Sequence, residues 1–466
     1  MLSPLPFTPF EELMLYQDSR AYPCNCFIRL KLRGRPQKEA LEEAFQTALQ
    51  RHPLLTARVE FRRRSPWWIW DECPSPTIEW HECEHDAELD SATTHRRLDL
   101  ETGPGIRLVV VSGRSVSHLD IHFHHACCDG LGIFQFIHDL LVLYDRQCNP
   151  AAGGTRLPVV DPDLLRNRGK FGLTKGKLLR MLPKQAVGLL GVRQFLMREP
   201  VAIIPHERFP ATAPEPTPYP AVVSWQSCPK TAKCIRQAAT NSGATTNDLL
   251  ARDLFLALSD FRGERDVEAE QHWLRMMVPV NLRTATDRAM PAANVVSSVF
   301  LDRRLADFRD ANQLLNGIHE EMELIKRNQL GFTFVFSLSA FRRFPGGLRR
   351  SARGQRCESS VVFTNLGKLL GRAPLARDDG RLICGDIVLD HIEILAPLAP
   401  YTCVAFAAGW YADRLTITLH YDPRILTTAD SQQLLSAYVA RIQQTADRDV
   451  ATNDSSSHVV NSLSAS

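Results

Sequence analysis

Strand patterns alternate with amphipathic helix patterns in both halves of this 466-residue chain. Residues 25–32, NCFIRLKL, alternate apolar and polar side chains with the period of a half-buried strand. Residues 36–53 follow, and they place five apolar side chains on one helical face: Leu41, Ala44, Phe45, Ala48 and Leu49. Further strand patterns occupy 55–61, 66–70, 106–112 and 117–125, and a helix pattern follows at 132–144. The first half therefore predicts strands and helices in alternation.

The second half repeats this alternation. Strand patterns occupy 221–227, 273–280, 294–301, 359–365, 403–411 and 414–422, with helix patterns at 245–261, 310–328 and 428–444. Such alternation predicts an α/β or α+β protein, and the chain exceeds the roughly 250 to 300 residues at which a single core stops growing. We expect an N-terminal lobe over 1–155, a basic, proline-bounded connection with one helix over 156–218, a C-terminal lobe over 219–447 and a disordered tail over 448–466.

Charge and hydropathy exclude several classes of protein. The formal net charge is +3, which is not the strongly basic balance of a nucleic-acid binder, so we expect no nucleic-acid partner. The N-terminus lacks the basic and apolar regions of a secretory signal, and no apolar run reaches the roughly 20 residues of a membrane span. We therefore expect a cytoplasmic monomer. The twelve cysteines form no CxxC pair and are interpreted as free thiols, mostly buried.

Residues 120–141, DIHFHHACCDGLGIFQFIHDLL, crowd histidines, cysteines and an aspartate before an apolar run. If the first part is a strand, His122 and His124 point to one face while Phe123 and His125 point to the other. A zinc site needs three or four converging ligands, and this alternation prevents His124 and His125 from binding one ion. We therefore expect no metal site, and the same argument excludes a metal-dependent hydrolase.

Asp129 stands where the strand pattern ends and the helix pattern begins. Its carboxylate is suited to cap the free N–H groups of the helix, and Gly130 permits a tight turn. Capping alone does not require two histidines upstream.

These residues carry a resemblance. HHACCDG, 124–130, matches the HHxxxDG signature of the CoA-dependent acyltransferase superfamily, which includes chloramphenicol-acetyltransferase-like enzymes, peptide-synthetase condensation domains and wax ester synthases. TTNDLLA (245–251), VPVNLR (278–283), NVVSS (294–298) and FTNLG (363–367) are similar to wax ester synthase segments or to the family's SNxG run, and the opening strand, helix and RHPLLTAR run also resemble these proteins. The resemblance spans nearly the whole chain.

The resemblance implies two chloramphenicol-acetyltransferase-like lobes with a tunnel between them and His125 midway along it. His125 would be the general base that takes a proton from an alcohol or amine acceptor as it attacks an acyl thioester, with no acyl-enzyme. The N–H of Gly130 is the expected oxyanion donor. His124 and Asp129 would be structural, with Asp129 paired to Arg283, although a surface arginine at a strand end is the alternative for Arg283.

Four further residues lie in matching segments and are candidates for the substrate channel: Asn247, Asp248, Asn294 and Asn365. Each is equally a candidate for a helix cap or a turn residue. His122, His138 and Cys127 are interpreted as structural.

The resemblance also has implications for cofactors and binding partners. The resemblance implies no permanently bound cofactor, with acyl-CoA or an acyl-carrier thioester as co-substrate and a small-molecule acyl acceptor. No adenylation or carrier domain is recognised in the sequence, so a separate carrier protein is a further candidate partner. The rival hypothesis is a non-catalytic condensation-like binding or scaffold module.

A basic segment, 166–184, admits two interpretations. Its cations stand beside Phe171, Leu173, Leu178 and Leu179, a composition that suits contact with an anionic membrane surface or with CoA phosphates. A solvated linker face is the other interpretation.

Overall fold

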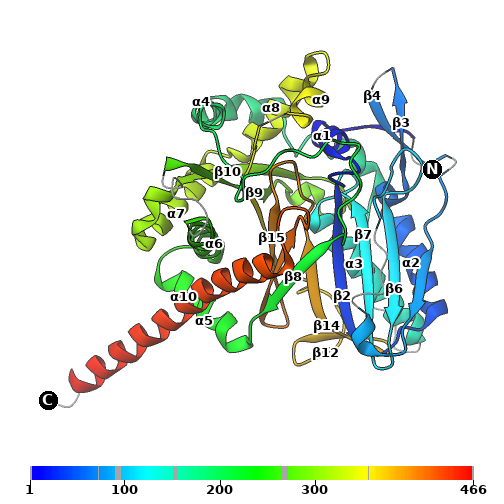
Figure 1. Ribbon diagram of the computed structural model, residues 1–466. Helices are drawn as coiled ribbons and strands as arrows, with labels where there is room; N and C mark the ends of the chain where they lie inside the picture. The colour runs from blue at the N-terminus through cyan, green and yellow to red at the C-terminus, as the bar shows by residue number, and fades with distance from the viewer. Residues whose placement is uncertain are drawn as a thin grey trace.

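The computed structural model describes residues 3–63, 65–71, 73–89, 96–150, 156–263, 271–354 and 356–463. They fold into two lobes, each built on a mixed sheet with helices against it (Figure 1). This arrangement confirms the predicted α/β fold class with two lobes. No helix in the described ranges combines the length and apolar character needed to cross a membrane.

The N-terminal lobe contains a seven-stranded sheet in the order β12-β13-β14-β2-β7-β6-β5. Its strands are β2 (Asn25–Arg33), β5 (Ile78–Glu82), β6 (Ile106–Ser112), β7 (Val116–His124), β12 (Arg377–Asp378), β13 (Arg381–Cys384) and β14 (Ile387–Leu395). Only β5 and β6 pair in parallel among these strands. A small sheet, β1-β4-β3, joins β1 (Leu5–Pro6), β3 (Arg58–Arg62) and β4 (Ser65–Ile69).

Two helices cover one face of the N-terminal sheet, α2 (Lys38–Arg51) and α3 (Gly130–Cys148). The apolar faces that the sequence predicts for them enter a common core with alternate residues of the central strands, including Ile28, Leu30 and Ile121. Burial of these alternate side chains fixes the register of β2 against β7, because a slip by one residue would turn them outward.

The C-terminal lobe contains a six-stranded sheet in the order β10-β9-β11-β15-β16-β8. Its strands are β8 (Ala221–Gln226), β9 (Trp273–Asn281), β10 (Val296–Arg304), β11 (Val361–Lys368), β15 (Val404–Tyr411) and β16 (Arg414–Tyr421). The helices of this half are α5 (Pro229–Asn241), α6 (Thr246–Gly263), α7 (Ala311–Arg327), α8 (Gly331–Arg343), α9 (Gly347–Ala352) and α10 (Thr428–Leu463).

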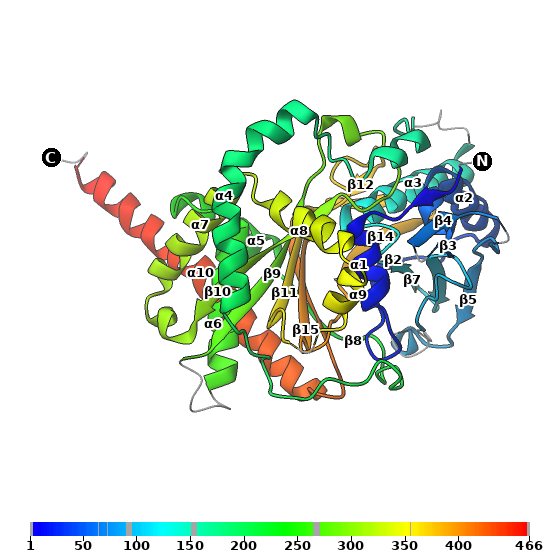
Figure 2. The same ribbon diagram turned by 90° about the horizontal axis from the view of Figure 1, so that it is seen from above.

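The connection between the lobes carries one long helix, α4 (Lys175–Met197), within the predicted range 156–218. Helix α1 (Pro9–Gln17), which the sequence reading did not identify, packs against α8 and α9 through Phe10, Leu13, Leu338, Leu348 and Ala352. Figure 2 shows α1, α4, α8 and α9 on one side of the molecule.

Two parts of the fold differ from the expected residue ranges. Strands β12, β13 and β14 belong by sequence to the second half but complete the N-terminal sheet, where β14 pairs with β2. Helix α10 continues to Leu463, through most of the range predicted as a disordered tail, 448–466. Extension of a nucleated helix gains one backbone hydrogen bond per residue, a contribution that composition alone does not reveal.

Candidate active site

The turn between β7 and α3 carries the HHxxxDG residues between the two lobes. His124 ends the strand and Asp129 is the N-cap of the helix, where its side chain accepts a hydrogen bond from the N–H of Gly132 at 2.9 Å. The backbone N–H of His125 donates to the carbonyl of Cys24 at 2.9 Å, next to β2. The strand end and the helix cap therefore hold the backbone of the turn from both sides.

Asp129 is paired with Arg283 across the lobe junction. The guanidinium donates to both carboxylate oxygens, from Nη1 to Oδ2 at 2.8 Å and from Nη2 to Oδ1 at 2.9 Å. Oδ2 also accepts from the backbone N–H of Val295 at 2.9 Å, so the buried carboxylate receives hydrogen bonds from both lobes. Charge-assisted bidentate pairs of this kind fix orientation as well as adding stability. Asp129 thereby joins the α3 N-terminus to the segment between β9 and β10.

Asn294 supports the same turn from the C-terminal lobe. Its Nδ2 donates to the carbonyls of His125 and Ala126, each at 2.8 Å. Its Oδ1 is buried without a hydrogen-bond partner among the described residues. Of the four residues proposed for the substrate channel, Asn294 is the one that contacts the backbone of the histidine pair directly.

His124 is fully buried, and its ring is held at Nδ1 by a backbone hydrogen bond. Nδ1 accepts from the backbone N–H of Ala126 at 3.1 Å, which places the proton of the neutral ring on Nε2, 3.7 Å from Oδ2 of Asp18. Arg97 donates to the same oxygen at 2.7 Å. Burial raises the pKa of Asp18, but the bonds and charges of His124 and Arg97 outweigh it, so the pKa lies below its usual value.

His125 differs from His124 because its side chain is partly exposed. The ring of Phe10 meets it edge-on, with 5.8 Å between the ring centroids, and Nδ1 is buried. Burial lowers the pKa of His125, although the Asp129 carboxylate and nearby backbone groups act in the opposite direction. The neutral imidazole is therefore favoured, which is the form that accepts a proton.

Gly130 lies against the C-terminal lobe. A Cβ at this position would stand 2.8 Å from Cδ2 of Leu366, in the FTNLG segment of β11. The N–H of Gly130 belongs to the first helical turn, whose donors have no intrahelical partner. Asn365, beside Leu366, accepts from the N–H of Gly367 at 3.0 Å, which makes it a turn residue in this structure.

Asn247 and Asp248 occupy a different part of the C-terminal lobe, at the start of α6, which lies away from α3 in both views (Figures 1 and 2). Asp248 accepts from the backbone N–H of Thr245 at 2.9 Å, while its own N–H donates to the Thr245 hydroxyl at 3.2 Å. It also contacts Nδ1 of His319 at 2.9 Å. Asp248 therefore has the helix-cap role that the sequence left open.

The other residues of the cluster are packed into the fold. Cys127 and Cys128 are fully buried, and burial raises the pKa of both thiols well above the usual value. The ring of His122 contacts Phe27 edge-on, and Nδ1 of His138 lies 3.0 Å from Oδ1 of Asp139. The described residues include no group of three or more His, Cys, Asp or Glu side chains arranged to hold a metal ion.

Sequence reasoning missed Phe10, Asp18, Arg97 and Leu366, which surround the turn. Asp18 and Arg97 are far apart in the sequence and carry no local motif, so nothing in the pattern connects them with His124. Phe10 lies in α1, whose short apolar segment was not identified as a helix. Leu366 is inside a segment that the resemblance singles out, but its contact with Gly130 requires the three-dimensional arrangement.

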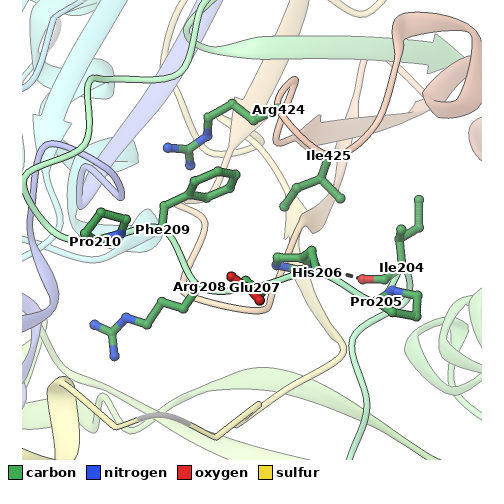
Figure 3. A pocket seen from close by; sticks show the side chains of 9 residues that line it. All are labelled: Ile204, Pro205, His206, Glu207, Arg208, Phe209, Pro210, Arg424 and Ile425. Carbon is green, nitrogen blue, oxygen red and sulfur yellow. Dashed lines mark hydrogen bonds between the residues drawn. The ribbon is translucent and has the colours of Figure 1, made fainter.

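Two hollows open elsewhere on the surface, and neither is lined by His125. The first has a volume of about 410 Å³ and lies along 204–210 with Arg424 and Ile425 (Figure 3). The Arg424 guanidinium is stacked 3.9 Å from the Phe209 ring centroid, and the Phe209 N–H donates to the Tyr22 hydroxyl at 3.1 Å. The second, about 330 Å³, lies between 4–9 and the basic stretch 166–170. The predicted tunnel through His125 stays a prediction.

No family model matches the chain. Two uncharacterized proteins of Mycobacterium tuberculosis, Rv2305 and MT2362, are each 23% identical over 385 residues, 79% of this chain and 84% of theirs.

Solved structures match over almost the full length. The epimerization domain from the third module of tyrocidine synthetase B has a TM-score of 0.67 at 13% identity, covering 97% of this chain and 98% of that one. A variant of the starter condensation domain of rhizomide synthetase, solved with C8-CoA, gives 0.67 at 15%, covering 96% and 95%. SgcC5 of Streptomyces globisporus gives 0.66 at 13%, covering 95% and 99%. The chain therefore has the two-lobed fold of condensation and epimerization domains.

Proposed function

We propose that this protein transfers an acyl group from a thioester to an alcohol or amine acceptor, with His125 as the general base. The observation that supports this most strongly is the contrast within the histidine pair. The ring of His124 is buried, with Nδ1 bonded to a backbone N–H and Nε2 3.7 Å from the Asp18 carboxylate, whereas His125 is partly exposed on a turn braced by Arg283 and Asn294. Only His125 is free to meet a substrate.

The proposed reaction breaks the acceptor O–H or N–H bond and the carbon–sulfur bond, and it forms a carbon–oxygen or carbon–nitrogen bond and an S–H bond. Nδ1 of His125 is buried, which leaves Nε2 to take the proton of the acceptor hydroxyl or amine. The acceptor atom attacks the thioester carbonyl carbon, and the carbonyl oxygen gains negative charge in the tetrahedral intermediate. When this intermediate collapses, the carbon–sulfur bond breaks and the imidazolium returns its proton to the leaving thiolate. The products are an ester or amide and a free thiol.

The negative charge on the carbonyl oxygen requires a donor close to His125. The N–H of Gly130 is our candidate, because it lies in the first turn of α3, where the helix dipole favours an anion. Asp129 and Arg283 act as positioning residues in this scheme. Their side chains are paired with each other, the Asp129 carboxylate also accepts from backbone N–H groups, and the Arg283 guanidinium also donates to the Ala293 carbonyl.

The thioester is proposed to be an acyl-CoA or a carrier-bound acyl group. Two proteins of the same fold guide this choice, one solved with C8-CoA and one with a naphthyl-substituted ethanediol. The first supports an acyl-CoA donor and the second supports an alcohol acceptor. The likeness to an epimerization domain identifies the fold and does not name a reaction for this chain.

The test is mass-spectrometric detection of acyl transfer and CoA release, with acyl-CoAs of graded length and pooled alcohol and amine acceptors. His125→Gln keeps a polar side chain but removes the base, so we expect at least a hundredfold loss of transfer. His85→Ala, at an exposed histidine in a loop, is the matched control and should retain full activity. Thermal unfolding of each variant shows that the comparison is made between folded proteins.

Three outcomes separate the hypotheses. Loss of transfer in His125→Gln alone supports the proposal. Equal transfer by His125→Gln and the unaltered protein would eliminate His125 as the base. If calorimetry detects acyl-CoA binding but no transfer occurs with any acceptor, the non-catalytic binding module becomes the better description.

A further inference from the structure

Helix α4 presents an unusual concentration of apolar side chains to solvent. Six of its large apolar residues are between 41% and 69% exposed: Leu178, Leu179, Leu189, Leu190, Leu196 and Met197. Exposed leucines that occur singly need no explanation, but contiguous patches mark sites of interaction.

These six residues form two parallel rows on one face of α4. Leu178, Leu189 and Leu196 make one row and Leu179, Leu190 and Met197 the other, each with spacings of eleven and seven residues. Those spacings correspond to about three turns and about two turns of a helix, so each row follows the helix axis on either side of Pro183, which lies inside α4. The rows together are an apolar stripe that faces away from the protein.

The opposite face of α4 holds the helix on the C-terminal lobe. Met181 is buried, Oε1 of Gln185 accepts from the Thr333 hydroxyl at 2.9 Å, and a Cβ at Gly188 would stand 2.5 Å from the same hydroxyl oxygen. Further along, the Phe195 ring lies 4.8 Å from that of Phe300, between centroids. The exposed stripe is therefore not the face that the fold uses for packing.

Charge on α4, α8 and α9 has one sign, although Arg342 of α8 is paired with Glu12 of α1. Helix α4 contains five cations and no acidic residue: Lys175, Lys177, Arg180, Lys184 and Arg193. No ion pair joins any of them to a carboxylate of the described residues. The adjoining segment 331–354, which forms α8 and α9, also has five arginines and no acidic residue, and it exposes Phe341 and Phe344. The whole chain carries a formal charge of only +3, so the cations are segregated here.

We propose that the face formed by α4, α8 and α9, visible in Figure 2, docks on the surface of an anionic lipid bilayer. The apolar rows of α4 enter the boundary between headgroups and acyl chains, and the lysines and arginines of α4, α8 and α9 contact the anionic headgroups. A basic helix with a separate apolar face has the composition of an interfacial helix that lies in the plane of the membrane. This inference does not depend on the proposed reaction at His125.

The test is flotation of the full-length protein with vesicles. Binding to phosphatidylcholine vesicles that contain about one-third phosphatidylglycerol should exceed binding to phosphatidylcholine alone by at least tenfold. Binding should weaken as NaCl is raised from about 0.05 to about 0.5 M, because salt screens the headgroup charge.

Two double variants separate charge from insertion. Lys177→Glu with Arg180→Glu should reduce binding to anionic vesicles at least tenfold, whereas Lys230→Glu with Lys233→Glu, the same charge change on exposed residues of α5, should leave it unchanged. Leu179→Ser with Leu190→Ser should also reduce binding at least tenfold, and Val159→Ser, at a side chain 80% exposed, is the matched control.

Other occupants give different results. Equal flotation of the α4 variants and the unaltered protein would overturn the proposal. A second set of results would also overturn it: the unaltered protein sediments as a dimer, the variant Leu179→Ser with Leu190→Ser sediments as a monomer, and neither kind of vesicle carries the protein in flotation. In that case the stripe is an interface between copies of the chain.

Discussion

His125 must be uncharged to accept a proton, and its surroundings favour that form. Burial lowers its pKa from the ordinary value of 6.5, while Asp129, the nearest carboxylate of the turn, is already neutralised by Arg283. In the proposed mechanism the pairing of Asp129 also serves His125, because an unpaired carboxylate would favour the imidazolium and raise the pKa of His125.

This environment predicts the pH dependence of the proposed reaction. Protonation of His125 removes the base, so kcat/KM should fall as the pH drops through an apparent pKa below 6.5, and it should be constant from there to about pH 8. The measurement is a profile of kcat/KM between about pH 4.5 and about pH 8. Arg283→Met, which leaves Asp129 without its cation, should move the acid limb upward. An acid limb above 6.5 in the unaltered protein would contradict the assignment.

At the scale of elements, the junction between α3 and β11 depends on the absence of a side chain at residue 130. Gly130→Ala would bring a Cβ to 2.8 Å from Cδ2 of Leu366, closer than unstrained contacts allow. Leu366 is partly exposed and can change rotamer to relieve the contact, so we expect a loss of stability of about 0.5 to 1.5 kcal/mol, measured by urea unfolding. Leu366→Ala in the same protein removes the clashing atoms, so the cost of Gly130→Ala should largely disappear there. Equal costs in both backgrounds would show that the two residues are not coupled.

The same element shows what sequence can and cannot predict. The period of two in 117–125 and the apolar run after Asp129 identify a strand, a cap and a helix, and the structure contains all three. The resemblance also names Arg283, which lies 154 positions away and forms the ion pair. The partners of His124 have no such signal, because Asp18 and Arg97 are recognised only by their proximity in space. Local periodicity predicts helices and strands, whereas contacts between them are predicted only where a family motif names the residues, and otherwise become known from the structure.

At the scale of the whole molecule, β14 makes the two lobes interdependent. It belongs to the second half of the sequence, yet it covers the edge of β2, with Ile392 opposite Leu30 and Ile394 opposite Ile28. The sequence reading divided the chain by length and by its proline-bounded connection, and neither feature reveals a strand that crosses to the other sheet. A strand that joins the sheet of the other lobe pairs with a segment far away in the sequence. The entropy lost in closing the long loop and the stability gained from the pairing cannot be judged from a local sequence pattern.

The position of β14 in the N-terminal sheet predicts which strands lose protection against amide exchange when a cavity is made at β14. Ile392 is 1% exposed and packs in the N-terminal core, while Ile417 of β16 is 0% exposed and packs in the C-terminal core. Each change to Ala should cost about 2 to 5 kcal/mol, because both create a cavity among buried side chains.

Hydrogen exchange read by mass spectrometry then locates the effect. Ile392→Ala should accelerate amide exchange chiefly in β2 and β7, far from it in sequence, and Ile417→Ala should do so in β8 and β15. If Ile392→Ala instead accelerated amide exchange in β8 and β15 and left β2 protected, β14 would not stabilise the N-terminal sheet. The N-terminal lobe that contains His125 would then be complete without β14. The backbone of His125 would still be held next to β2, because its N–H donates to the carbonyl of Cys24, which directly precedes β2.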